Sequence, residues 1–368
     1  MQHSQKIIER SKLNLPKIFI NYRLSSIHMK TITKGIKMNN FKKVGLTALA
    51  GSLAAISAHA AEMTVSGATL LTYTTEDKTE VTGNPLGMKT NLGFTASGEV
   101  NGYTVSYMQT SKDQFAGMTS ARLSVDMGDM GTLAFDQGSG SGLGTIDDKT
   151  PTAAEEIWDG LDGDTVGGLV GAAGASGVLN YVKAFGDITF NGAARRGSGT
   201  KNADGASSGA GESAWDFALT GSGDNYGAPG LAFGLGYGEA ENGSAANDAS
   251  AGETEHSTIF ANYSVGAVTV GVQVSEIERN AASTDEHTQA FGIAFNVNDD
   301  LSISYGERDV EYDKTGSNAT VTEKGTGIAV AYTMGSIKIA GNRNDVKDND
   351  GTAASNDEMT EIAVSFAF

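Results

Sequence analysis

Seven carboxylates are concentrated in one Gly-rich segment of the chain, Gln137 to Ser176. They are Asp147, Asp148, Glu155, Glu156, Asp159, Asp162 and Asp164. The sequence has no cysteine, and beyond residue 60 its only histidines are His256 and His287, so thiol nucleophiles and histidine-rich metal sites have no candidates. Ser257 and Ser275 lie near these histidines, but nothing in the sequence fixes a catalytic triad. The chemistry that these residues offer is electrostatic, and we do not expect an enzyme.

Five basic residues are candidates to oppose the acidic segment: Lys89, Arg122, Arg195, Arg308 and Lys338. Lys89, Arg122 and Arg195 fall on the polar side of stretches in which apolar and polar residues alternate. Acidic and basic groups facing each other across water would set up a transverse field that orders water and ions. The alternative interpretation is that the acidic segment is simply a solvated loop.

The elements that must position these residues are short segments with a period of two, the period of a β-strand. In residues 86–98, for example, Met88 and Phe94 alternate with Lys89 and Asn91. Segments of this kind, each about ten residues long, recur through the rest of the chain, and we count about sixteen.

The connections between these segments alternate in length. Those after even-numbered segments are mostly short turns, whereas those after odd-numbered segments are longer and rich in Gly, Asp, Asn and Ser. Short turns on one side and long loops on the other are typical of a transmembrane β-barrel. We therefore predict an all-β fold, a sixteen-stranded antiparallel transmembrane β-barrel with both termini on the side of the short turns.

A soluble β-sandwich also has alternating strands, but it needs large apolar side chains on its inner faces. Here the side opposite the large apolar residues carries Ala, Gly, Ser, Thr, Asn and a few charges. In lipid a β-sheet satisfies every backbone group only if it is closed. The composition of the two faces therefore favours a barrel that is apolar outside and wet inside.

The first 60 residues have a different character. Residues 38–60 begin with a basic pair, Lys42 and Lys43, which is followed by an apolar stretch. They end in a cleavage site with small residues at Ala58 and Ala60. We interpret residues 38–60 as a signal peptide. We interpret residues 1–37 as an over-extended start, and residues 61–368 as the barrel. A functional amino-terminal extension is the alternative.

The charge of the barrel segment excludes one class of partner. The first 60 residues hold ten Lys and Arg and one Glu, so the remaining 308 residues carry 16 basic and 43 acidic side chains, a net charge of −27, whereas the whole chain carries −18. Such a surface repels nucleic acid.

The last eight residues, EIAVSFAF, place four large apolar side chains on one face of a strand that ends the chain. These are Ile362, Val364, Phe366 and Phe368. The pattern resembles the signal that barrel-assembly machinery recognises in Gram-negative outer-membrane proteins. Residues 61–73, AEMTVSGATLLTY, are similar to the first strand of the general porins, so the chain resembles a Gram-negative general porin over residues 61–368.

This resemblance implies a homotrimer of sixteen-stranded barrels in the outer membrane, with residues 137–176 folded inward as a constriction loop. The implied function is passive diffusion of ions and small hydrophilic solutes, and the acidic balance predicts a mild preference for cations. The alternative is a non-conducting barrel that serves adhesion or envelope structure. No cofactor is implied. Asp348 to Gly351 match part of a calcium-binding loop, but Val346 occupies the first ligand position, so we expect only weak divalent cation binding at external loops, bridging lipopolysaccharide phosphates.

Overall fold

The computed structural model describes residues 62–76, 84–112, 117–159, 161, 167–174, 176–196, 213–242, 252–279, 285–313 and 320–368. The predicted over-extended start and signal peptide lie outside these residues, and so do Asp162 and Asp164. Within the described ranges, no helix is both long and apolar enough to cross a membrane.

Sixteen β-strands make up most of the described structure. They are β1 Glu62–Glu76, β2 Leu86–Val100, β3 Tyr103–Lys112, β4 Gly117–Asp126, β5 Thr132–Gln137, β6 Ser176–Phe185, β7 Ile188–Arg195, β8 Ala214–Ser222, β9 Leu231–Asn242, β10 Gly252–Val265, β11 Val268–Glu278, β12 Asp285–Asn296, β13 Leu301–Asp313, β14 Val321–Met334, β15 Ile337–Lys347 and β16 Asp357–Ala367. Four short 3-10 helices lie between them: η1 Gly128–Met130, η2 Gly142–Thr145, η3 Asp224–Tyr226 and η4 Asn349–Gly351.

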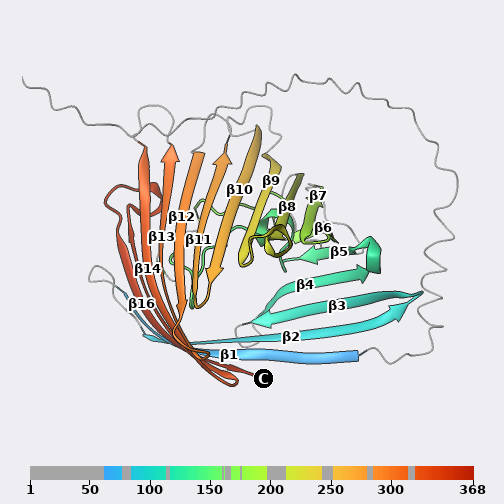
Figure 1. The fold of residues 1–368 in the computed structure, drawn as a ribbon, viewed down its shortest axis with the longest axis horizontal. Coiled ribbons are helices and arrows are strands. Elements are labelled where there is room, and N and C mark those ends of the chain that lie inside the picture. Colours follow the sequence, from blue (N-terminus) through green and yellow to red (C-terminus); the bar gives the residue numbers. More distant parts are fainter. Residues whose placement is uncertain are drawn as a thin grey trace, which may run out of the picture. The chain divides into compact units, whose positions relative to one another are not determined.

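The strands pair in sequence order and close into a single antiparallel barrel, because β1 pairs with both β2 and β16 (Figure 1). The seam is completed at the last residue of the chain, where Gly67 and Phe368 exchange two backbone hydrogen bonds of 2.9 Å each. Closure leaves no free sheet edge, as a strand in lipid requires. The predicted sixteen-stranded antiparallel barrel is thus confirmed.

Alternation along each strand separates an apolar outer face from an inner face of small and polar residues. On the outside, Val272, Ile328 and Ile362 each expose more than half of their surface, although they are large and apolar. On the inside, their neighbours are residues such as Gln273 and Gly327. An apolar exterior around a polar interior is the arrangement expected of strands with lipid on one side and water on the other.

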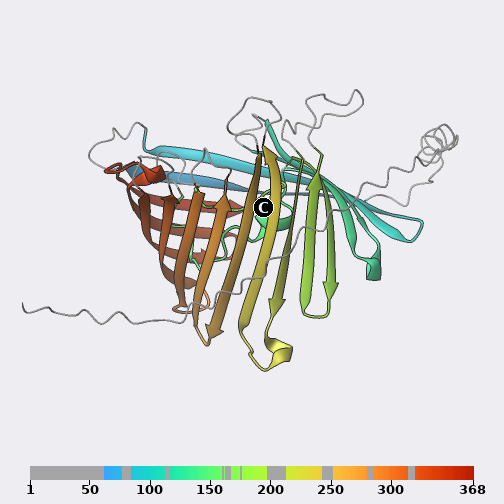
Figure 2. The same ribbon diagram turned by 90° about the horizontal axis from the view of Figure 1, so that it is seen from above.

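The connections follow the predicted alternation of lengths with one departure. Those after even-numbered strands have two to eight residues, and Figure 2 shows the turns of β6 to β13 together at one end of the strands. Those after odd-numbered strands have six residues or more, except the connection between β3 and β4. β3 ends at Lys112 and β4 begins at Gly117, which leaves only residues 113–116 between them.

Candidate functional site

The longest connection is the β5–β6 loop, residues 138–175, and its described residues contact the inner face of the wall. Asp216 on β8 is 3% exposed, and its carboxylate accepts hydrogen bonds from the backbone N–H of Leu143 at 3.1 Å and of Ala173 at 2.7 Å. One buried side chain therefore holds the outgoing and the returning limb of the loop together. Charge-assisted bonds of this kind are stronger than neutral ones.

Gln273 on β11 binds the next part of the loop. Its amide nitrogen donates to the carbonyl oxygens of Ile146 at 2.9 Å and Asp147 at 2.8 Å, and its amide oxygen accepts from the Lys149 N–H at 2.7 Å. The side chain is 3% exposed, so these bonds satisfy backbone groups that the loop brings out of water.

A row of four glycines on the inner wall provides space for the middle of the loop. The row consists of Gly271 on β11, Gly292 on β12, Gly306 on β13 and Gly327 on β14, each the direct cross-strand partner of the next. A Cβ at Gly271 would lie 2.5 Å from the ring of Pro151, and a Cβ at Gly306 or Gly327 would lie 2.9 or 2.8 Å from the Ile157 side chain. Only residues without a side chain allow Pro151 and Ile157 to pack this closely against the wall.

Asparagines stand at both ends of the glycine row. Asn262 on β10 is the cross-strand partner of Gly271, and Asn344 on β15 is that of Gly327. The Asn262 amide donates to the carbonyl oxygen of Lys149 at 2.7 Å, whereas the Asn344 amide donates to those of Glu156 at 3.1 Å and Asp159 at 2.8 Å. The acidic middle of the loop is thus fixed at both of its ends.

The far end of the loop is held by buried charges. Arg308 on β13 is 3% exposed, pairs with Glu323 on β14 at 3.3 Å and donates to the Gly167 carbonyl oxygen. Glu286 on β12 accepts from the Gly168 N–H at 2.5 Å. These groups are paired within the wall and loop, so Arg308 is a residue that positions the loop.

The five described carboxylates of the predicted acidic loop have different environments. Asp148 accepts a hydrogen bond from the Trp158 indole at 3.1 Å, so this tryptophan links two parts of the same loop. Burial raises the pKa of Asp147 and of Glu156 above their usual values, and Asp148, Glu155 and Asp159 nearby raise that of Glu156 further. The stretch Pro151–Trp158 forms a turn, not a helix.

The five predicted basic residues all lie on inner-face positions of their strands, but only two of them point into open space. Arg122 on β4 pairs with the fully buried Asp136 at 3.4 Å and donates to the Gly140 carbonyl oxygen at 3.1 Å. Arg195 on β7 lies beside Gly174, whose Cβ would come within 2.9 Å of the guanidinium. Arg308 is paired with Glu323, so the two that point into open space are Lys89 on β2 and Lys338 on β15.

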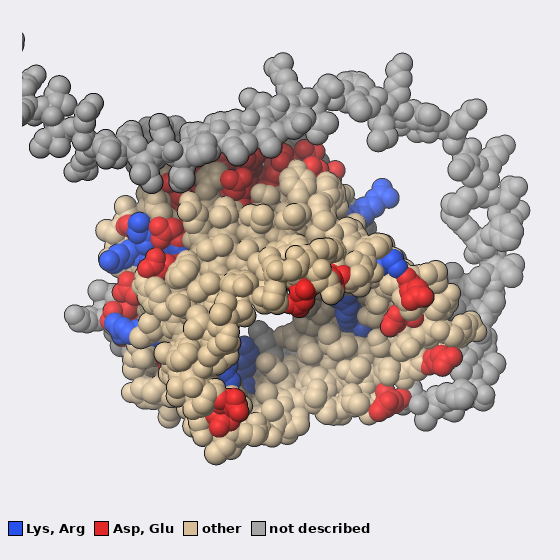
Figure 3. Space-filling model, in the orientation of Figure 1, with Lys and Arg blue, Asp and Glu red and all other residues tan. Residues whose placement is uncertain are grey.

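Lys89 and Lys338 line one cavity with the Glu155 side chain. Its volume is about 260 Å³, and its lining comes from β1, β2, β15, β16 and the β5–β6 loop. Figure 3 shows an opening through the barrel with basic side chains on two sides of it and acidic side chains at its upper edge. A loop acid and two wall bases thus face the same water-filled space.

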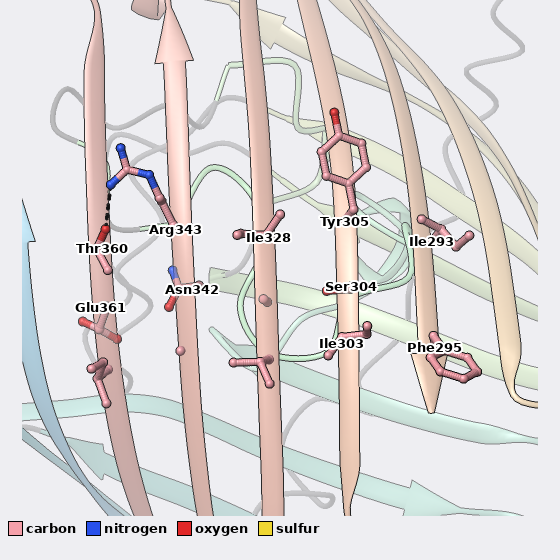
Figure 4. A pocket seen from close by; sticks show the side chains of 14 residues that line it. Ile293, Phe295, Ile303, Ser304, Tyr305, Ile328, Asn342, Arg343, Thr360 and Glu361 are labelled. Atoms are coloured by element: carbon pink, nitrogen blue, oxygen red, sulfur yellow. Dashed lines mark hydrogen bonds between the residues drawn. The ribbon is translucent and has the colours of Figure 1, made fainter. Parts of the chain in front are cut away.

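A second hollow, of about 640 Å³, lies on the outer face across β12 to β16 and is almost entirely apolar. Figure 4 shows its lining, including Ile293, Ile303 and Ile328, with Arg343 bonded to Thr360 at one end. These residues have the outward parity of their strands and face away from the lumen. The hollow belongs to the lipid-facing surface.

The acidic side chains of the described residues do not gather into a metal-binding cluster. Within the described ranges, no group of three or more His, Asp and Glu side chains is arranged to hold a metal. In the predicted partial calcium-binding loop, an Asp348 carboxylate oxygen accepts the N–H of Ala354 at 2.6 Å.

Sequence reasoning did not identify Asp216, Asn262, Gln273 or Asn344, nor the glycine row, as loop-binding residues. A further inward glycine, Gly236 on β9, lies against Leu143 and Ile146 of the loop. These residues could have been found from their positions, because each is a polar residue or a glycine at an inward position of a strand.

The fold and the loop define a class of protein: a closed barrel with an apolar exterior, a wet interior and a long loop packed on its inner wall is a transmembrane pore. The chain belongs to the Gram-negative porin family, whose model matches residues 45–368. It is accordingly a diffusion channel of the Gram-negative outer membrane, not an enzyme, as predicted.

Solved structures share the fold at low sequence identity. The chain is similar to OmpF of Salmonella typhi in complex with daunomycin, with 12% identity and a TM-score of 0.61, covering 84% of this chain and 98% of that one. It is similar to an anion-selective porin from Comamonas acidovorans, with 11% identity, a TM-score of 0.60 and coverages of 84% and 100%. It is also similar to a trimer form of OmpT from Vibrio cholerae, with 10% identity, a TM-score of 0.58 and coverages of 83% and 99%. No curated protein sequence matches the chain.

Proposed function

We propose that this porin passes ions and small hydrophilic solutes by passive diffusion and mildly prefers cations. The observation that carries the proposal is that several arginines of the inner face are already neutralised. Arg122 pairs with Asp136, Arg279 with Glu286, and Arg308 with Glu323. Their fields are therefore largely cancelled within the wall.

The charges that remain next to the passage are mainly acidic. The β5–β6 loop contributes five described carboxylates, those of Asp147, Asp148, Glu155, Glu156 and Asp159, and one ammonium group, that of Lys149. The wall adds the ammonium groups of Lys89 and Lys338. A net negative lining raises the local concentration of cations. The preference is mild because both signs of charge line the passage.

The experiment is to measure the reversal potential of the purified protein in a planar bilayer with a KCl gradient. We expect a potential of the sign that marks K⁺ as the more permeant ion. Clear anion preference would reject the selectivity and leave the channel intact, whereas an absence of single-channel steps would favour a non-conducting barrel of adhesive or structural function.

We further propose a homotrimer that is delivered by barrel-assembly machinery and surrounded by outer-membrane lipid and lipopolysaccharide. The delivery step is supported by the apolar side chains at the end of the chain, which lie at outward positions of β16 and directly after it. They are Ile362, Val364, Phe366 and Phe368. The processed chain would be residues 61–368, after removal of the signal peptide 38–60. Gel mobility before and after heating tests the oligomer, because a folded trimer runs above the heat-denatured monomer.

A further inference from the structure

Two wall lysines and one loop glutamate face a single cavity inside the lumen, and we propose that this cavity is a binding site for acidic amino acids. The proposal rests on the proposed function, because the solute reaches the cavity through the water-filled lumen. It adds to that function a class of solute and the residues that recognise it.

The register of the seam places the two lysines in one row across four strands. Lys89 on β2 is the partner of Leu70 on β1, Leu70 is the partner of Ser365 on β16, and Ser365 is the partner of Lys338 on β15. Three steps of roughly 4.8 Å between neighbouring strands put the two lysine Cα atoms about 14 Å apart. Their long side chains can therefore approach the two ends of one small molecule lying between them.

The three charged groups of the cavity have one charged neighbour that does not line it, because Glu361 on β16 interacts electrostatically with Lys89 and with Glu155. Neither lysine ammonium nor the Glu155 carboxylate makes a hydrogen bond or ion pair with another described residue. Arg122 and Arg308 on the same inner surface, in contrast, are bound to carboxylates. The charges of Lys89, Lys338 and Glu155 are thus available to a solute.

The floor of the cavity is made of small side chains. Ala68 on β1, Ala340 on β15 and Ala363 on β16 line it beside the lysine row, and Leu70 adds one larger apolar contact. The volume of about 260 Å³ corresponds to roughly eight or nine water molecules at 30 Å³ each. This is enough space for a molecule of amino acid size.

The charge pattern of the cavity matches an acidic amino acid group by group. Two ammonium groups complement the two carboxylates of the solute, and the Glu155 carboxylate complements its ammonium group. Asn91 and Ser365 in the lining offer further hydrogen bonds, and Leu70 offers an apolar contact for the methylene groups. A dicarboxylate without an amine leaves Glu155 unmatched, and a neutral amino acid leaves one lysine unmatched.

The test uses three solutes of similar size: L-glutamate, glutarate, which lacks the amine, and L-glutamine, which lacks the second charge. Each is titrated against the single-channel KCl current of the purified porin, at about 0.1 M salt so that screening stays moderate. We expect glutamate to reduce the current at a concentration about tenfold below either of the other two, which corresponds to about one good ion pair. Equal effects of all three solutes, or no effect on a conducting channel, would overturn the proposal.

Substitutions assign the contributions of the separate charges. Lys338→Gln should raise the half-blocking concentration of glutamate to that of glutamine, and Glu155→Gln should remove the advantage of glutamate over glutarate. Lys324→Gln is the matched control, because Lys324 lies on the outer face of β14, paired with Asp309 at 3.3 Å, and should change neither value. An unchanged glutamate response in Lys338→Gln contradicts the site, whereas a wild-type protein without any conductance contradicts the proposed function instead.

Discussion

Asn262 and Asn344 stand at the two ends of one row of cross-strand partners and hold the same loop segment at its two ends. Four glycines separate them, one on each strand from β11 to β14. Asn262 binds the carbonyl oxygen of Lys149, and Asn344 binds those of Glu156 and Asp159. The glycines thus leave space for the middle of the loop segment, and the two asparagine amides bind its two ends.

Replacing both asparagines should loosen the loop without unfolding the barrel. Asn262→Ala and Asn344→Ala each remove hydrogen bonds worth about 1 kcal/mol apiece, and the effects should add because the two sites do not touch. We expect greater open-channel current noise in the double variant than in either single variant. Noise at the wild-type level in the double variant would show that these contacts do not restrain the loop.

A side chain in the glycine row should push the loop into the passage. In Gly306→Val the new side chain would collide with Ile157, while Asp216 and Arg308 still hold the limbs of the loop, so the loop can only move toward the lumen. We expect lower single-channel conductance. Gly98→Val is the control, because an added Cβ at Gly98 meets nothing within 4 Å. Unchanged conductance in Gly306→Val would mean that the loop does not narrow the passage.

Acidification should weaken the cation preference at a pH above that at which ordinary carboxylates take up protons. Burial raises the pKa of Asp147 and Glu156, so on lowering the pH these two take up protons at a pH above the ordinary values of about 3.9 and 4.3. The loop then loses negative charge, and the reversal potential should move toward zero in that window.

The double variant Asp147→Asn, Glu156→Gln should lack this early phase. Asp224→Asn is the control, because hydrogen bonds from Ser222 and Gly230 lower the pKa of Asp224 in a turn after β8. An early phase that persists in the double variant would contradict the assignment.

The seam should depend on the backbone of Phe368 more than on its ring. Deleting Phe368 removes two backbone hydrogen bonds with Gly67, each worth about 1 kcal/mol, whereas Phe368→Ala keeps both bonds and loses only the ring that lies close to Gly67. We expect the deletion to lower the temperature of the heat-induced gel shift more than the alanine variant does. Equal shifts would show that the hydrogen bonds at the seam contribute little.

The sequence predicts which face each side chain takes but not which residues meet across strands. Alternation is local, so the inward positions of Arg122 and Lys338 follow from their neighbours alone. The pairing of Arg308 with Glu323 depends on the register of β13 against β14, and the Lys89 to Lys338 row depends on how the barrel closes. Register in a closed barrel is set by strand number and stagger together, which no single segment encodes.

The acidic loop must lie inside a conducting lumen if this porin works as proposed, and a single introduced thiol tests that position directly. The chain has no cysteine, so Glu155→Cys provides one unique site, and Val272→Cys on the outer face provides the control. Single-channel conductance is measured while a charged, water-soluble thiol reagent is added. We predict a stepwise fall in conductance for Glu155→Cys and none for Val272→Cys, whereas a Glu155→Cys channel that reacts with the reagent and conducts as before would contradict the account.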